Sequence, residues 1–298
     1  MNIDEHITRR DILIRLPAAA AILSAHEALG QAVAQKPAGQ PASREDRNSP
    51  RILALRLLTA VPLADMRNFY HKKIGFAVVK EGPTELTLQA GATQLTFVKA
   101  LPEHIKGNGG RGNGEPMYHF AFNIPRNKIE AARKWQLERT PLVPPRSEVR
   151  DSKMPAEVWH FRHWNAHSVF FFDPAWNIVE YIARHDLKND AGADDHFDVK
   201  DIHCASEIGY VTTRADQSKT IAFMRDKLGL SEYPRGAEPW AMGDERGLLL
   251  CLARAGEQWA EHTKTPVNWG IFPTECTIRG PKTGTYDIAG FPFSVRAE

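Results

Sequence analysis

From Arg51 onward, hydrophobic and polar residues alternate in short runs that predict strands, and one longer run has the spacing of a helix. In the helical run, Met66, Phe69 and Ile74 fall on one face, and Gly75 follows as a residue suited to a helix C-terminus. The runs are ordered strand, helix, strand, strand, strand, at residues 52–58, 62–75, 77–79, 85–88 and 94–98. This order predicts one β-α-β-β-β module.

A second module is predicted after a Gly/Asn-rich segment at residues 101–115. It begins with an alternating run at 118–124, has its helix near 127–137, and ends with the strand at 178–182. The turn sequence Asp173-Pro174-Ala175-Trp176-Asn177 introduces that last strand.

An internal repeat marks a third module. The segment 223–230 repeats the pattern of 69–76 at an offset of 154 residues, including the glycine that ends the helix. Residues 263–298 are too few for a complete fourth module, although 268–278 and 291–295 could form strands. We expect a second half-barrel that is completed by this tail or by another subunit of a homodimer.

Composition shifts divide the chain into five segments. They are an N-terminal targeting segment (1–34), a polar linker (35–50), a first domain of two modules (51–187), an acidic linker (188–202) and a second, incomplete domain (203–298).

The targeting segment resembles a twin-arginine export signal. Arg9 and Arg10 precede the alanine-rich run 18–25, and Ala32-Val33-Ala34 has the form of a signal-peptidase site. The apolar run is too short for a stable membrane span. The alternatives are a general secretory signal and a disordered basic N-terminus, but the interrupted apolar run favours the twin-arginine type, so we expect a periplasmic or secreted protein.

Charge and cysteine content exclude several kinds of partner and site. The net charge of +2 on 298 residues, without long runs of like charge, gives no electrostatic footprint for nucleic acid. Cys204, Cys251 and Cys276 allow at most one disulfide and lack the paired spacing of a zinc site. Nucleic acid is therefore set aside as a partner.

His119 and Glu180 are the candidate metal ligands. His119 shares a strand face with Ala121 and Asn123, away from the phenylalanines of its run, and Glu180 lies between Ile178 and Ile182 on one face of the last strand. A carboxylate among apolar neighbours is costly to bury alone. An imidazole and a carboxylate from two strands supply two of the three protein ligands that an open catalytic metal site needs.

At these residues the chain resembles the vicinal oxygen chelate superfamily, which includes glyoxalase I, extradiol dioxygenases and the fosfomycin and bleomycin resistance proteins. The resemblance covers about residues 51–252 and rests on three segments, which are the strand opened by His119-Phe120-Ala121-Phe122, the Asp173–Glu180 turn and strand, and the helix end Phe69–Phe76. It implies an α+β fold in which repeated β-α-β-β-β modules pair into cup-shaped, half-barrel mixed sheets. It also implies a divalent metal, such as Fe, Mn, Zn or Ni.

The resemblance supplies only two ligands of a standard set. In the family, ligands lie on the first and last strands of paired modules, but module one offers Ala54 or Leu55 and Leu95 or Thr96 at these positions. A third ligand or an acid–base group could come from the histidine-rich stretch 159–167, where His167 and His163 are the catalytic candidates and His160 a further one. Glu207 matches a first-strand position of module three and could belong to a second site.

Two classes of function stay open. The first is an exported metalloenzyme, a lyase, isomerase or ring-cleaving dioxygenase, whose metal chelates vicinal oxygens of a small substrate. The second is a non-catalytic binding or sequestering protein of the same fold, in which His119 and Glu180 serve as hydrogen-bonding groups. The incomplete ligand set favours the second class, and the retained His–Glu pair favours the first.

Overall fold

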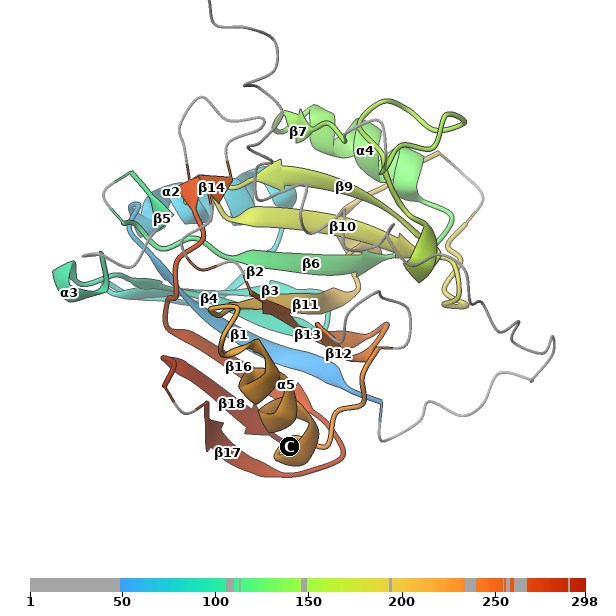
Figure 1. Ribbon diagram of the computed structural model, residues 1–298. Coiled ribbons are helices and arrows are strands. Elements are labelled where there is room, and N and C mark those ends of the chain that lie inside the picture. The colour runs from blue at the N-terminus through green and yellow to red at the C-terminus, as the bar shows by residue number, and fades with distance from the viewer. Residues whose placement is uncertain are drawn as a thin grey trace, which may run out of the picture.

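The strands of the computed structural model form two large sheets and one small sheet (Figure 1). The structure describes residues 49–105, 110–112, 114–145, 149–192, 195–233, 240–253, 255, 258–259, 267–288 and 290–298. The predicted targeting segment and all but the end of the first linker lie outside these residues.

The first large sheet joins the two ends of the described chain. It consists of β1 (Arg51–Thr59), β2 (Ala77–Glu81), β3 (Glu85–Ala90), β4 (Thr93–Lys99), β16 (Thr274–Arg279), β17 (Gly284–Asp287) and β18 (Phe293–Ala297). Their order is β17-β18-β16-β1-β4-β3-β2, with β1 parallel to β4 and antiparallel to β16. Module one therefore shares a sheet with the C-terminal tail.

The second large sheet is built from the middle of the chain. It consists of β6 (His119–Ile124), β7 (Leu142–Val143), β8 (Trp159–Phe161), β9 (Ala166–Phe172), β10 (Ile178–Arg184), β11 (Cys204–Val211), β12 (Ala241–Asp244) and β13 (Gly247–Leu252). The order is β12-β13-β11-β6-β10-β9-β7, and β8 pairs with β9. The antiparallel pair of β6 and β11 joins module two to module three.

The remaining elements are short. The helices are α2 (Leu63–Arg67), which continues as a π-helical segment (Asn68–Ile74), α3 (Pro102–Ile105), α4 (Ile129–Leu137) and α5 (Gln217–Asp226), with 3-10 turns at Arg162–Trp164 and Val199–Asp201. The strands β5 (Gly110–Arg111), β14 (Gln258–Trp259) and β15 (Val267–Asn268) form the small sheet. Gly75 has a φ of 101°, which explains why the helical segment before it ends there.

The predicted α+β class with paired modules and mixed sheets is confirmed, but the modules pair differently from the expectation. Each large sheet takes strands from both 51–187 and 203–298, so the two predicted domains do not form separate sheets. The first strand of a module leaves one edge unpaired, and that edge can bond to any other module that presents a first strand. The sequence repeat identifies the modules, whereas the choice of partner depends on the tertiary fold.

Two apolar clusters lie on opposite faces of the second sheet. Along β10, Val179, Tyr181 and Ala183 belong to the larger core, which also takes in β1, β4 and α5, while Ile178 and Ile182 belong to a smaller cluster with Leu248 and Trp269, among others. This alternation follows from the period of two in a strand. The face with the smaller cluster carries the candidate site.

No helix among the described residues is long and apolar enough to cross a membrane. Cys204, Cys251 and Cys276 are free thiols, the last two of them buried.

Candidate metal centre

Three side chains that can bind a metal meet on the second sheet. His119 begins β6, Glu180 lies in β10 and Glu207 lies in β11, so the strands on both sides of β6 contribute a carboxylate. His119 Nε2 lies 3.6 Å from Glu180 Oε2 and 3.7 Å from Glu207 Oε2. All three side chains are buried, with exposed fractions of 4% or less.

The turn before β10 sets the register that brings His119 and Glu180 together. Asp173 accepts hydrogen bonds from the backbone N–H and the side-chain amide of Asn177, at 2.9 and 2.8 Å, and the Tyr70 hydroxyl donates to the same carboxylate at 2.8 Å. The Asn177 Oδ1 accepts from the backbone N–H of Tyr118, at 2.9 Å. The turn motif thus fastens the start of β10 to the residue before His119.

The ring of His119 is oriented for binding through Nε2. Its Nδ1 lies 3.0 Å from the carbonyl oxygen of Ile178, which can only accept, so Nδ1 carries the proton. In the neutral ring this leaves the lone pair on Nε2, which faces the two carboxylates. The ring of Phe170 packs against the imidazole with centroids 6.0 Å apart.

Glu207 is held as an anion by Arg184. The Arg184 guanidinium contacts the Glu207 carboxylate and donates to Asn123 Oδ1 at 3.2 Å from Nε. Burial by itself opposes ionisation of Glu207, but the positive charges of Arg184 and His119 outweigh it and lower the pKa of this carboxyl. Glu207 is therefore an ionised carboxylate.

The pKa values of Glu180 and His119 are both raised, whereas that of Glu207 is lowered. Burial and then the Glu207 charge raise the pKa of Glu180 to about 8. Burial lowers the pKa of His119, but the contact with Glu207 and the charge of Glu180 outweigh it, so the net shift is upward. Protons on these two groups balance the negative charge that a divalent cation would otherwise balance.

The residues fit a divalent metal. One ligand atom from each of the three side chains lies within 4.8 Å of the others. Oε1 of Glu180 is buried without a hydrogen-bond partner among the described residues, which is costly unless another group is bound. One imidazole and two carboxylates form a donor set suited to Fe(II), Mn(II), Zn(II) or Ni(II), with further positions left for substrate.

The two predicted catalytic histidines lie elsewhere. His167 pairs with Ala183 and therefore faces the larger core, on the opposite side of the sheet from Glu180, which pairs with Phe170. It belongs to a separate group with Asp151 and His160. His163 lies in the 3-10 turn between β8 and β9 and is in neither group. A catalytic role for His167 at the His119 site is contradicted by strand parity.

Glu207 is the third candidate ligand of the His119 site, which the sequence did not assign. Its position on the first strand of module three was recognisable, but its assignment to a second site assumed that modules one and two pair. Ala54, Leu55, Leu95 and Thr96 all lie in the other sheet, so module one contributes nothing to this site. The module repeat was the signal that could have identified Glu207.

Known structures resemble this chain in fold at low sequence identity. A candidate dioxygenase from Bacillus subtilis aligns with a TM-score of 0.50 and 12% identity over 83% of this chain and 84% of its own. A glyoxalase I variant from Zea mays aligns with a TM-score of 0.47 and 13% identity over 84% of this chain and 94% of its own. A glyoxalase/bleomycin resistance protein/dioxygenase from Nocardioides has 20% identity and a TM-score of 0.34 over 52% of this chain and 93% of its own.

No protein-family model and no curated protein matches the sequence. With identities this low, the first of these alignments supports the architecture and not an activity. Together with the paired β-α-β-β-β modules, it shows that the chain has a fold like that of vicinal oxygen chelate proteins.

Proposed function

We propose that the protein is a metal-dependent enzyme that acts on a small molecule with neighbouring oxygen atoms. The observation that carries the proposal is the convergence of His119, Glu180 and Glu207 from three adjacent strands on one buried point. A divalent ion held there would polarise substrate oxygens and stabilise an enolate or similar anion. The fold shared with a candidate dioxygenase is consistent with this reading.

The protein's own groups would prepare this site. Arg184 keeps Glu207 ionised, and the Ile178 carbonyl keeps the lone pair of His119 on Nε2. Glu207 is thus already ionised, whereas His119 offers its Nε2 lone pair to a metal only after it has released a proton. The surrounding cluster of Ile178, Ile182 and Leu248 limits water around the bound substrate.

Glu180 is the residue that we propose moves the proton. In the metal-free protein, burial and the charge of Glu207 raise the pKa of its carboxyl to about 8, so this carboxyl would hold and release a proton when it is not bound to the metal. His167 faces away from the site, and Phe170, which has no titratable group, packs beside His119. These positions favour lyase or isomerase chemistry through Glu180 over ring cleavage assisted by a histidine.

A non-catalytic binding protein is the second candidate. One observation favours it, since Arg184 and the protons on His119 and Glu180 can balance the carboxylates without a metal. In that case the same polar groups would hydrogen-bond a sequestered ligand.

Metal content and turnover separate the two candidates. Purified protein, His119→Ala and Glu180→Gln are compared by elemental analysis, with His196→Ala, which changes an exposed histidine, as the control. The enzyme proposal expects each site variant to lose one metal equivalent relative to wild type while the control loses none. Equal metal content in all four proteins would leave only the binding candidate.

Activity is then screened with hemithioacetals of α-ketoaldehydes and with catechols, in the presence of Fe(II), Mn(II), Zn(II) or Ni(II). Glu180→Gln is expected to lower turnover by at least about 10²- to 10⁴-fold, the usual contribution of a positioned acid–base group, because it removes a metal ligand as well as that group. Turnover of catechols with uptake of dioxygen would instead assign ring cleavage.

We also propose export, on the strength of Arg9, Arg10 and the Ala32–Ala34 motif. Cell fractionation of the full chain and of a variant with both arginines replaced by lysine tests this proposal. Retention of the wild-type protein in the cytoplasm would rule it out.

A further inference from the structure

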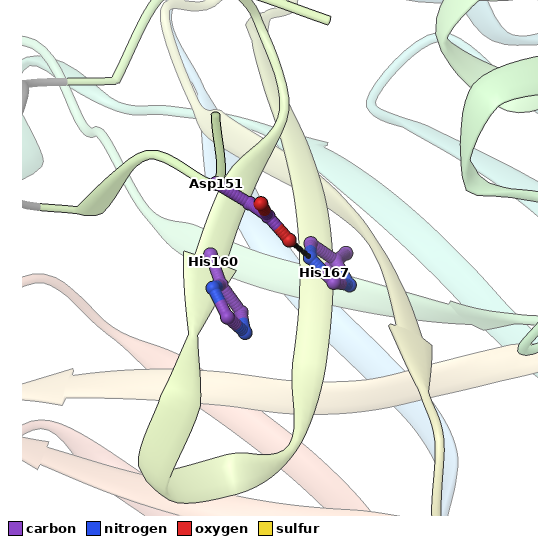
Figure 2. Close-up of side chains that lie close together, drawn as sticks. All are labelled: Asp151, His160 and His167. Atoms are coloured by element: carbon purple, nitrogen blue, oxygen red, sulfur yellow. Dashed lines mark ion pairs between the residues drawn. The ribbon is translucent and has the colours of Figure 1, made fainter. Parts of the chain in front are cut away.

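A second group of metal-binding side chains lies on the other face of the same sheet. His160 in β8 and His167 in β9 are directly paired in register, and their rings stack with centroids 4.4 Å apart and an interplanar angle of 12°. The bridge between Arg150 and Trp159 brings the neighbouring Asp151 alongside. Figure 2 shows the Asp151 carboxylate directed at the His167 ring, with Oδ2 3.4 Å from Nε2.

Two ring nitrogens of this group make no hydrogen bond among the described residues. Nδ1 of His160 and Nε2 of His167 are buried atoms without a hydrogen-bond partner among the described residues. Buried ring nitrogens normally find a partner, and a cation bound between these nitrogens and the Asp151 carboxylate would satisfy both. One ligand atom from each of Asp151, His160 and His167 lies within 4.8 Å of the others.

His185 orients the ring of His167. Its Nε2 lies 2.7 Å from Nδ1 of His167, so one of these nitrogens must donate to the other. When Nδ1 of His167 donates, the lone pair of that ring lies on Nε2, the atom nearest Asp151. This is the arrangement in which metal-bound histidines are held by a neighbouring acceptor.

The imidazoles of this group and their neighbour His185 have lowered pKa values. Partial burial and mutual repulsion lower the pKa of His167 to about 4, and burial also lowers the pKa of His160 and His185. The imidazoles are therefore neutral at neutral pH, as metal ligation requires. The charged groups that face them are Asp151 and Asp186, which attract a cation, and Arg162 and Arg126, which oppose it.

We infer that Asp151, His160 and His167 form a second site for a borderline divalent transition metal, of which Zn(II) is the type. Two imidazoles and one carboxylate are a zinc donor set, and the half-exposed position leaves room for water as the remaining ligand. A ring nitrogen binds a metal in the plane of its ring, so one of the two stacked imidazoles would turn out of the stack when the ion binds. The ligand atoms would then lie roughly 3.3 Å from one another, the spacing set by zinc–ligand bonds of about 2 Å. The metal would fasten the segment around Asp151 to the β8–β9 hairpin.

The inference does not depend on the proposed function, because the two groups lie on opposite faces of the sheet and share no ligand. Metal binding is measured on the full protein with Zn(II) by calorimetry and with Co(II) by absorption spectra. The proteins are wild type, Glu180→Gln, His160→Gln, Asp151→Asn and the control His196→Gln, which changes an exposed histidine 3.3 Å from Asp198.

We expect Glu180→Gln to bind one equivalent of Zn(II). When Asp151→Asn or His160→Gln is added to that variant, this equivalent should no longer bind. His185→Gln should weaken Zn(II) binding about 10- to 100-fold, the usual effect of losing a group that orients a ligand. In ¹⁵N spectra, the ring signals of His160 and His167 should shift on zinc addition in Glu180→Gln, and those of His196 should not.

Two results would overturn the inference. One is a Glu180→Gln protein whose His160 and His167 signals do not respond to zinc. The other is a remaining equivalent that survives both Asp151→Asn and His160→Gln. Either result would leave the His119 site unaffected, whereas a wild-type protein that binds zinc at Asp151, His160 and His167 but not at the His119 site would count against the proposed function alone.

Discussion

Arg184 and Glu207 form an ion pair that passes over β6, and both side chains are at most 1% exposed. Arg184 ends β10 and Glu207 lies in β11, with Asn123 of β6 bonded to the guanidinium between them. The pair links module two to module three directly at the candidate metal centre. It also leaves Glu207 ionised while its neighbour Glu180 holds a proton.

Replacing Arg184 with Met should destabilise the metal-free protein by about 3–5 kcal/mol, because it leaves Glu207 as a buried charge without its main partner. Urea unfolding in the presence of a chelator measures the change. The double variant Arg184→Met/Glu207→Gln should recover part of the loss. A double variant no more stable than the single one would show that the guanidinium acts through packing, for example against Trp164.

Metal affinity at the His119 site should increase with pH. The pKa values of Glu180, about 8, and of His119 are both raised, so these groups must release protons before they can bind a cation. Between about pH 6 and pH 8, affinity should increase up to about tenfold per pH unit for each proton released. Competition against a chelator of known affinity measures this slope. An affinity that stays constant over this pH range would contradict the assignment.

Leu250→His should add a fourth ligand. In the parallel pair β6–β10, His119 is opposite Ile178, and Glu180 comes two residues later. In the parallel pair β11–β13, Glu207 is opposite Leu248, so Leu250 holds the place of Glu180. The variant should bind Zn(II) more tightly than wild type and be less stable without it, since a buried imidazole replaces an apolar side chain. Leu249→His, on the opposite face, is the control and should not tighten binding.

Asn177→Ala should cost about 2–4 kcal/mol of stability, because it leaves the buried Tyr118 N–H and the Asp173 carboxylate each without one hydrogen bond. The matched control is Asn127→Ala. Asn127 also makes two side-chain bonds, to the backbone of Ala191, but it is exposed. Thermal unfolding should show a much smaller loss for the control. Equal losses would mean that the turn does not fix the strand register.

The group of Asp151, His160 and His167 should make the metal-free protein sensitive to acid. The pKa of His167 falls to about 4 in the folded protein, below its ordinary value of about 6.5. The unfolded chain therefore binds more protons in that window, and stability falls as the pH drops through it. His167→Gln should reduce this dependence when unfolding is measured from pH 7 down to about 4. A variant with the same acid profile as wild type would refute the assignment.

The sequence predicted most of the local structure and two of the three residues of the His119 site. The alternation of His119 and Glu180 with apolar residues put each on the correct strand face. The Asp173–Asn177 turn predicted the start of the strand that carries Glu180. The histidine stretch 159–167 was also visible as a chemical feature. The parity of His167 with Val169 and Phe171 could be counted along its strand. Its face relative to Glu180 could not, because that depends on the register between β9 and β10.

The sequence by itself determined the modules, their turns and the residues on each face of a strand, because these depend on periodicity and on the conformations of a few residues. Only the tertiary structure decided that module two pairs with module three and that Glu207 joins His119 and Glu180. The physical reason is that the edge bonds between first strands are made by backbone groups, which are the same in every module and leave no record in the side-chain pattern.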